Sequence, residues 1–187
     1  MENVKKIEFK NSNIPQSHFD IIHLEELFAR QLEHDITALH KVNFYLMFFI
    51  TDNKGEHRID FTDYKYKAGD VLTIRKDQLH KFTRSKAKGF LLVFTEEFVV
   101  AFLEELEALK TLQLFNELLG NPKIALNKKE YQDILGLVKN INHEYFNITD
   151  EHSSAIIRSA LHILIAKLYR VKADKKSTIS ERKYLQQ

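Results

Sequence analysis

Residues 68–82 read AGDVLTIRKDQLHKF, and this stretch decides the fold that the sequence predicts. A Gly-Asp turn leads into the short apolar strand VLTI, and RKD forms a charged tip. A second strand follows and carries His80, with Gln78 and Phe82 at alternate positions. Because successive side chains of a strand point to opposite faces, these three residues share one face. The stretch therefore predicts an antiparallel hairpin with one histidine beside an aromatic side chain.

The neighbouring sequence has the same character as far as residue 97. LHKVNFYLMFFI (39–50) is rich in aromatic and β-branched residues and ends at the turn TDNKGE. EHRIDF (56–61) alternates in period two, which is typical of a strand. The residues on one of its faces are His57, Ile59 and Phe61. Short strands at intervals of about 8–12 residues predict an antiparallel sandwich or barrel.

From residue 98 onward the pattern is helical. Thr95, followed by two glutamates, has the pattern of an N-cap. The helix that follows it is expected to end at Gly-Asn-Pro (120–122). Asn127 and Glu130 have the spacing of a capping box for a second helix. A third apolar stripe follows, so the sequence predicts an α+β protein with about three helices after the strands.

Composition narrows the classes of function. The chain has 187 residues, no cysteine and a formal net charge of +2. Without cysteine there is no disulfide, thiolate metal site or cysteine nucleophile, and a reducing compartment is favoured. The balanced charge gives no general attraction to nucleic acid or membranes, and no stretch reaches the ~18 continuous apolar residues that span a bilayer. We therefore expect a soluble, cytoplasmic protein.

The nine histidines form no recognised metal-binding pattern. Gly69 and His80 match the ends of the second cupin motif, G-x5-P-x-G-x2-H, and His40 resembles the start of the first. Apolar residues occupy the other ligand positions, so only His40 and His80 would face an ion, whereas a metal cupin needs about four ligands. We expect no metal, no cofactor and no catalytic residue, since no serine or lysine lies in an activating motif.

The order of the motifs resembles the N-terminal sensor domain of AraC-type transcription regulators over about residues 19–170. The matching segments are His40 to Tyr45, GEHRIDF (55–61), Tyr64 to Asp70, Gln78 with His80, and FTEEF (94–98). The resemblance implies a cupin-like antiparallel β-barrel, a double-stranded β-helix, followed by helices. The chain departs from the family at the RKD tip (75–77), where the family has a turn-fixing proline and glycine.

The resemblance also implies a division of the chain and a function. Residues 1–97 would form an N-terminal arm and a ligand-sensing barrel, 98–171 a helical dimerisation region, and 172–187 a linker. The linker would lead to a helix-turn-helix domain that is missing from the chain, through which alone the protein would bind DNA. The expected partner inside the barrel is a small-molecule effector. A stand-alone cupin, either a metal-dependent enzyme or a dimeric binding protein, is the alternative.

Strand alternation predicts which side chains would form the ligand pocket. In the cupin arrangement the face that carries His80 points inward, and so does the alternate set that begins at His40. The expected pocket residues are His40, Phe44, Phe48, Gln78, His80 and Phe82. Three of these are aromatic walls and three are polar contacts, which is typical of a ligand site. A filled core without room for a ligand is the alternative.

The third helix is the expected dimer interface, because the family pairs its sensors through the helices after the barrel. The residues expected to meet a symmetry-related copy are Ile157, Ala160, Leu161, Leu164 and Leu168. A self-complementary apolar stripe suits a twofold homodimer. The alternative is that the stripe is covered by its own chain.

Overall fold

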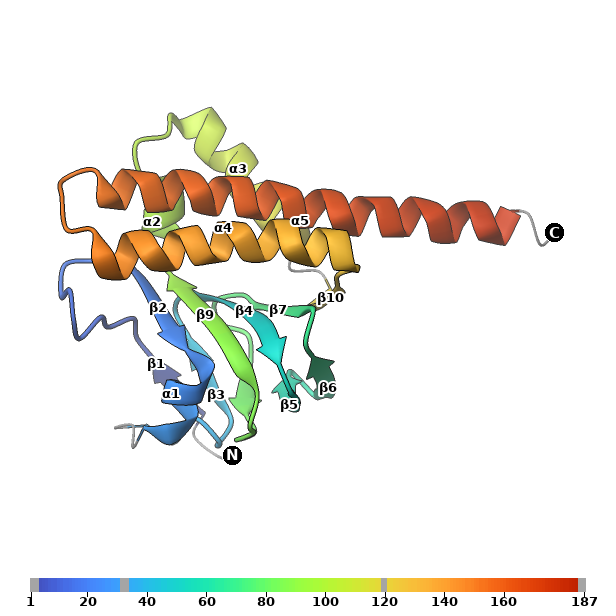
Figure 1. Cartoon of the computed structure of the whole chain (residues 1–187), viewed down its shortest axis with the longest axis horizontal. Coiled ribbons are helices and arrows are strands. Elements are labelled where there is room, and N and C mark those ends of the chain that lie inside the picture. Colours follow the sequence, from blue (N-terminus) through green and yellow to red (C-terminus); the bar gives the residue numbers. More distant parts are fainter. Residues whose placement is uncertain (1–3, 31–33, 119–120, 185–187) are drawn as a thin grey trace. The chain divides into compact units, whose positions relative to one another are not determined.

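The computed structural model describes residues 4–30, 34–118 and 121–184 (Figure 1). The chain divides into two compact units, which we describe one at a time. The sheet unit contains Met1–Leu103 and Asn121–Ala125, and the helical unit contains Glu104–Gly120 and Leu126–Gln187.

The sheet unit contains two five-stranded sheets. Sheet A consists, in spatial order, of β1 (Lys5–Ile7), β3 (His40–Val42), β8 (His80–Phe82), β5 (Lys54–Ile59) and β6 (Thr62–Lys67). Sheet B consists of β10 (Lys123–Ala125), β7 (Asp70–Ile74), β4 (Tyr45–Asp52), β9 (Lys88–Phe94) and β2 (Phe19–His23). Two short helices, α1 (Leu24–Ala29) and α2 (Glu96–Val100), complete the unit. Each strand pair is antiparallel except β1 with β3.

The chain passes between the sheets at tight turns. Asn53 (φ 61°) lies between β4 and β5, and Gly69 (φ 91°) lies between β6 and β7. Asparagine and glycine tolerate this left-handed backbone conformation better than other residues do. The structure therefore confirms both predicted turns and shows that they move the chain from one sheet to the other.

One apolar interior lies between the two sheets. Sheet A contributes Val42, Ile59, Tyr66 and Phe82, and sheet B contributes Leu46, Phe48, Ile50, Leu72, Ile74, Leu91 and Val93. The alternate residues of β4 supply this interior as the sequence pattern predicted. Phe61, predicted on the same face as His57 and Ile59, is instead 88% exposed. Asp60 (φ 53°) turns the chain before it, so the alternation ends at Ile59.

The predicted closed barrel needs a correction. The strand pairs among the described residues form two separate sheets rather than one ring of hydrogen-bonded strands. The sheets face each other through side chains, so burial of apolar surface holds them together across the interior. The broader prediction, an α+β protein with mostly antiparallel strands, is confirmed.

The described residues contain five helices, where three were predicted. One of the additional helices is α1, and the other arises because the first predicted helix is broken. The Thr95 hydroxyl accepts a hydrogen bond from the backbone N–H of Phe98, which confirms it as the N-cap of α2. The chain then leaves the helix, and Phe102 adopts φ 64° before the next helix begins. An apolar run with helical spacing carries no signal for such a break.

The helical unit contains α3 (Glu105–Leu118), α4 (Lys128–Asn147) and α5 (Ser153–Tyr184). Asn127 and Glu130 form the predicted capping box at the start of α4. Figure 1 shows α4 and α5 side by side, with α5 continuing beyond α4. The stretch 172–187, predicted as a linker, is helical as far as Tyr184, and residues 176–180 are exposed. Among the described residues, no helix has the length and apolar content needed to cross a membrane.

Two side chains of α5 hold the end of α3. The Lys172 amine, 8% exposed as a residue, donates to the backbone carbonyls of Glu117 (3.4 Å) and Leu118. Tyr169 donates its hydroxyl to the Glu117 carboxylate at 3.0 Å. The last carbonyls of a helix lack partners within the helix, and a cation there also interacts favourably with the helix dipole. Lys172 therefore acts as a C-terminal cap for α3.

Candidate functional site

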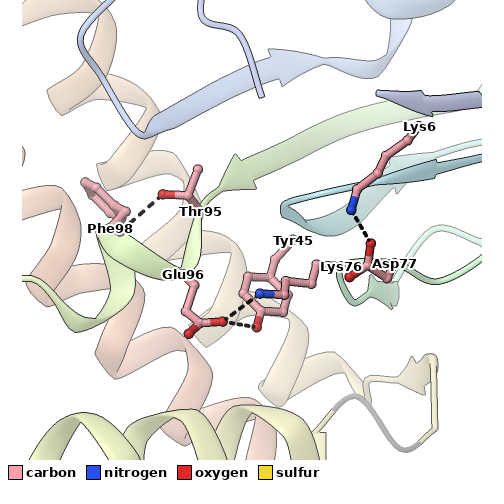
Figure 2. Close-up of polar contacts among 7 residues, drawn as sticks. All are labelled: Lys6, Tyr45, Lys76, Asp77, Thr95, Glu96 and Phe98. Atoms are coloured by element: carbon pink, nitrogen blue, oxygen red, sulfur yellow. Dashed lines mark hydrogen bonds and ion pairs between the residues drawn. The ribbon is translucent and has the colours of Figure 1, made fainter. Parts of the chain in front are cut away.

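The charged tip between β7 and β8 is held by ion pairs in place of the family's proline and glycine. Asp77 takes the left-handed conformation (φ 64°) that glycine would otherwise supply, and its backbone N–H donates to the Val42 carbonyl at 2.7 Å. Figure 2 shows Asp77 paired with Lys6 of β1 (2.9 Å) and Lys76 paired with Glu96 of α2 (3.2 Å). These contacts join the tip to three parts of the sheet unit and set the start of β8.

The start of β8 places His80 at the centre of sheet A. In the strand register His80 lies opposite His40 of β3 on one side and opposite Ile59 of β5 on the other. His57, two residues before Ile59, lies opposite Phe82. Directly opposed and diagonal side chains on one face of a sheet contact each other. The register therefore brings three histidines together, and we call His40, His57 and His80 the histidine cluster.

The histidine cluster is almost completely buried. The exposed fractions are 3% for His40, 1% for His57 and 0% for His80. The ring centroids of His40 and His80 are 4.3 Å apart, and those of His57 and His80 are 5.2 Å apart. Phe82 packs edge-on against His57 at 4.7 Å between ring centroids, and Phe48 lies 5.1 Å from His57. The cluster thus lies within the aromatic part of the interior.

Hydrogen bonding among the described residues leaves a buried nitrogen of His80 without a partner. His57 Nε2 and His80 Nδ1 are 3.0 Å apart, so one of these two nitrogens carries a proton and donates it to the other. His40 Nδ1 lies 2.9 Å from the Ala38 carbonyl. A carbonyl only accepts, so Nδ1 of His40 carries the proton and Nε2 of the neutral ring is an acceptor. His80 Nε2 is buried and has no hydrogen-bond partner among the described residues. A buried polar atom without a hydrogen bond lowers the stability of the folded state unless a ligand or water supplies that bond.

The surroundings keep all three imidazoles neutral. Burial, with a smaller effect of the His40 imidazole, lowers the pKa of His57 to about 3. Burial also lowers the pKa of His80 well below its ordinary value, and the two neighbouring imidazoles act in the same direction. The pKa of His40 is lowered by burial too, although its bond to the Ala38 carbonyl opposes the shift. At neutral pH the cluster is therefore an uncharged group of donors and acceptors.

Five of the six residues predicted for the pocket lie in this interior. Phe44, Phe48 and Phe82 belong to the core between the sheets, and His40 and His80 belong to the histidine cluster. Gln78 is buried, but its amide is used at the tip. Its nitrogen donates to the Asp60 carboxylate at 3.0 Å, and its oxygen accepts from the backbone N–H of Arg75 at 3.3 Å.

His57 belongs to the histidine cluster but was not among the residues predicted for the pocket. The alternation of EHRIDF already placed His57 on the same face as Ile59, and Ile59 is a core residue. What the alternation alone does not reveal is the register of β5 against β8, which sets His57 beside His80. The sequence of β5 therefore predicted that His57 faces the interior, but it did not predict which residue of β8 lies beside it.

The cluster is not arranged as a metal site. Among the described residues, no group of three or more His, Cys, Asp or Glu side chains is placed to hold a metal ion. Nitrogens of His57 and His80 face each other, and Nδ1 of His40 faces a carbonyl, so these three nitrogens already have hydrogen-bond partners. A transition metal requires convergent ligands at about 2 Å.

The residues predicted as the dimer interface lie on α5, and four of the five are buried within one copy of the chain. The exposed fraction is 5% for Ile157 and 0% for Leu161, Leu164 and Leu168, whereas Ala160 is partly exposed. Most of these side chains are thus already buried in one copy of the chain, and their part in a dimer stays a prediction. A different set of α5 side chains faces solvent, with Ile156 at 48% and Ile163 at 50% exposure.

Comparison with known proteins agrees with the motif order. The model of the AraC-like ligand-binding domain family matches residues 22–167. A search of curated proteins found no match. Among solved structures, the chain is similar to the AraC-like transcriptional activator CuxR, with 13% identity over 66% of this chain and 42% of CuxR and a TM-score of 0.42. It is also similar to ToxT from Vibrio cholerae O395, with 12% identity over 82% of this chain and 57% of ToxT and a TM-score of 0.43.

A cupin protein from Bacteroides fragilis is a further similar structure, with 20% identity over 56% of this chain and 91% of that protein and a TM-score of 0.29. The chain spans about half the length of the two regulators. The family match covers most of the chain, from β2 to residue 167, near the middle of α5. The chain therefore belongs to the family of AraC-like ligand-binding domains.

Proposed function

We propose that this chain is the effector-binding part of an AraC-type transcription regulator and that the effector binds between the two sheets, at the histidine cluster. The observation that carries the proposal is the buried Nε2 of His80, which lacks a partner among the described residues. A polar atom in that position is stabilised when a ligand supplies its hydrogen bond. Phe44, Phe48 and Phe82 would cover the apolar part of a small metabolite.

The response would reach a DNA-binding domain through α5. Lys175 pairs with Glu130 near the start of α4 at 3.9 Å, and the exposed, polar end of α5 follows this contact. In this proposal the end of α5 leads to a helix-turn-helix domain outside the chain. Ligand binding would favour one conformation of the chain over another, by no more than the difference in its affinity for the two.

Removing the His80 imidazole is expected to weaken effector binding at least tenfold. A metabolite screen by thermal shift would first supply a binding compound, and titration calorimetry would then compare the wild type with His80→Leu and His80→Gln. The loss of one buried hydrogen bond of about 1.4 kcal/mol corresponds to tenfold in the dissociation constant. The Gln variant keeps an amide that can bond to His57, which guards against misfolding.

His143→Leu is the matched control, because His143 lies on α4 and is exposed. The control is expected to bind as the wild type does. Unchanged binding by both His80 variants, each shown to be folded by circular dichroism, would contradict the proposed site.

We also propose that the chain forms a homodimer through the exposed face of α5. A shallow depression on this face is lined by His152, Ala155, Ile156, Ser159, Ala160 and Ile163. Small side chains lie in its centre and an isoleucine near each end, so an antiparallel second copy would place its isoleucines against the small residues. No acidic or basic residue other than His152 lines the depression, so two copies meet without like-charge repulsion.

Ile163→Glu is expected to convert this dimer to a monomer, because it would bury a carboxylate without a partner at the interface. Ile179→Glu is the control: Ile179 is exposed to a similar extent, 57% against 50% for Ile163, but at about 100° per residue it lies on nearly the opposite side of α5. Sedimentation velocity at micromolar concentration measures both variants. A monomeric wild type, or a dimer insensitive to Ile163→Glu, would rule out this interface.

A further inference from the structure

We propose that the histidine cluster selects a small monocarboxylic acid with an apolar body, and that the acid binds together with one proton taken from solvent. This inference rests on the interior ligand site proposed above and adds the chemical class of the ligand. It depends on three features of the cluster: its hydrogen-bonding groups, its lack of charge and its aromatic surroundings.

The hydrogen-bonding groups suit a carboxyl group. Nε2 of the neutral His40 is an acceptor, because Nδ1 carries the proton that is donated to Ala38. Nε2 of His80 is either a donor or an acceptor, since its bond to His57 can run in either direction. The two rings are only 4.3 Å apart between centroids. One carboxyl group offers an O–H donor and an acceptor oxygen about 2.2 Å apart, a spacing that can serve two neighbouring imidazoles.

The lack of charge around the histidine cluster disfavours binding of an ion there, unless the ion arrives with a proton that neutralises it. Outside the cluster, the charged or titratable side chains that act on its rings are His34 and Asp35, both on His40, whereas Asp60 is bonded to Gln78 at the tip. Lys41, Arg58 and Lys81 lie on the same three strands but at alternate positions, and all are partly exposed. Among the described contacts of the three rings, neither a carboxylate nor a cationic side chain faces the cluster.

A bare carboxylate would bring an uncompensated negative charge into this interior, and an ammonium ion would find no carboxylate to pair with. An acid that arrives with its proton leaves the site neutral. The proton lies between one carboxyl oxygen and His40 Nε2, on whichever atom holds it more strongly, and the other oxygen accepts from His80 Nε2–H. In both cases binding at neutral pH removes one proton from solvent, because the free acid is ionised and the free imidazole is neutral.

The surroundings favour an apolar body on the acid. Phe48 and Phe82 contact the cluster directly, with ring centroids 5.4 Å apart, and Phe44 and Ile59 belong to the same core. A ligand with several hydroxyl groups would leave some of them without partners here, which costs about 1–3 kcal/mol each. The interior therefore matches an alkyl or aryl monocarboxylic acid better than a sugar.

The test uses matched acids and alcohols. Butanoate, hexanoate, octanoate and benzoate, each with the alcohol of the same carbon skeleton, are titrated into the whole chain at pH 5.5, 6.5 and 7.5 by calorimetry. We expect the affinity for the best acid to fall about tenfold per pH unit, as uptake of one proton requires, and the affinity for its alcohol to stay constant. Repeating the titration in buffers of different ionisation enthalpy counts the protons directly.

His80→Gln is expected to weaken binding of the acid at least tenfold at pH 5.5, and His143→Gln, at an exposed position of α4, is expected to leave it unchanged. An acid that binds equally well at all three pH values, or an alcohol that binds more tightly than its acid at pH 5.5, would overturn the assignment of ligand class. In the second case the interior still takes a ligand, so the proposed function stands while this inference fails. If neither acids nor alcohols perturb the NMR signals of the interior imidazoles, the inference fails, and the metabolite screen decides the proposed function separately.

Discussion

Acidification from pH 7 to pH 5 is expected to lower the free energy of unfolding of this protein by several kcal/mol. His57 and His80 are buried and neutral in the folded state, with pKa values lowered by burial. In the unfolded chain a histidine titrates near pH 6.5, so below that pH the unfolded state binds more protons than the folded state. Stability therefore falls as the pH drops through 6.5, and the loss from His57 continues to about pH 3.

Each of these two imidazoles contributes about 1.4 kcal/mol per pH unit below 6.5. Together they remove on the order of 4 kcal/mol by pH 5, a large part of the 5–15 kcal/mol that is typical of a folded domain. Urea unfolding followed by circular dichroism at pH 7, 6 and 5 measures the effect. Carboxylates with lowered pKa values, such as Asp63 and Asp77, lose their contributions only at lower pH, so this window isolates the histidines.

His57→Leu separates the buried rings from the other histidines. The variant is expected to show a shallower dependence of stability on pH, by about one proton, whatever its stability at pH 7. His143→Leu leaves the histidine cluster intact and is the control, expected to keep the slope of the wild type. A stability that is flat between pH 7 and pH 5 would mean that the cluster is hydrated or charged in solution.

Replacing Gly89 by alanine is expected to cost at least about 3 kcal/mol of stability. Gly89 lies in β9 with φ 151°, and a Cβ there would lie 1.9 Å from the backbone carbonyl oxygen of Phe49. That carbonyl belongs to the neighbouring strand β4, beside the register shift between Ile50 and Asp52. Backbone in the middle of a sheet cannot move aside without breaking ladder hydrogen bonds, so strain and lost pairing add.

Gly136→Ala is the matched control for Gly89→Ala. Gly136 lies within α4, and no atom lies within 4 Å of the Cβ that alanine would add. Alanine is favoured over glycine in a helix by about 1 kcal/mol, so the control is expected to raise the melting temperature. Thermal unfolding by circular dichroism compares the two variants. A Gly89→Ala protein as stable as the wild type would contradict the described packing of β9 on β4.

Local signals were sufficient for the strands between residues 39 and 94 and for the N-caps of α2 and α4, but not for β1, β2 and β10. The Gly-Asp turn at residues 69–70, the alternation around His80 and the N-cap at Thr95 each depend on neighbours in the sequence, and the structure confirms them. The break at Phe102 was not predictable, because an aromatic residue in the left-handed conformation has no sequence signature. Contacts with residues distant in sequence determine this conformation, and the local sequence pattern does not reveal them.

The site was predictable in part for the same reason. Period-two alternation placed His80, Phe82 and Phe48 in the interior. It did not reveal that His57 bonds to His80, because the register between β5 and β8 is set by contacts distant in sequence. Likewise, the apolar stripe of α5 shows that one face is covered but not whether its own chain or a second copy covers it.

The most direct test of a ligand site at the histidine cluster is a crystal structure of the chain with the tightest ligand from the metabolite screen. We predict that the ligand lies between sheets A and B, with a polar atom within hydrogen-bond distance of His80 Nε2 and its apolar part against Phe48 and Phe82. A ligand bound outside the two sheets, with His80 Nε2 still buried and unpaired, would contradict this account.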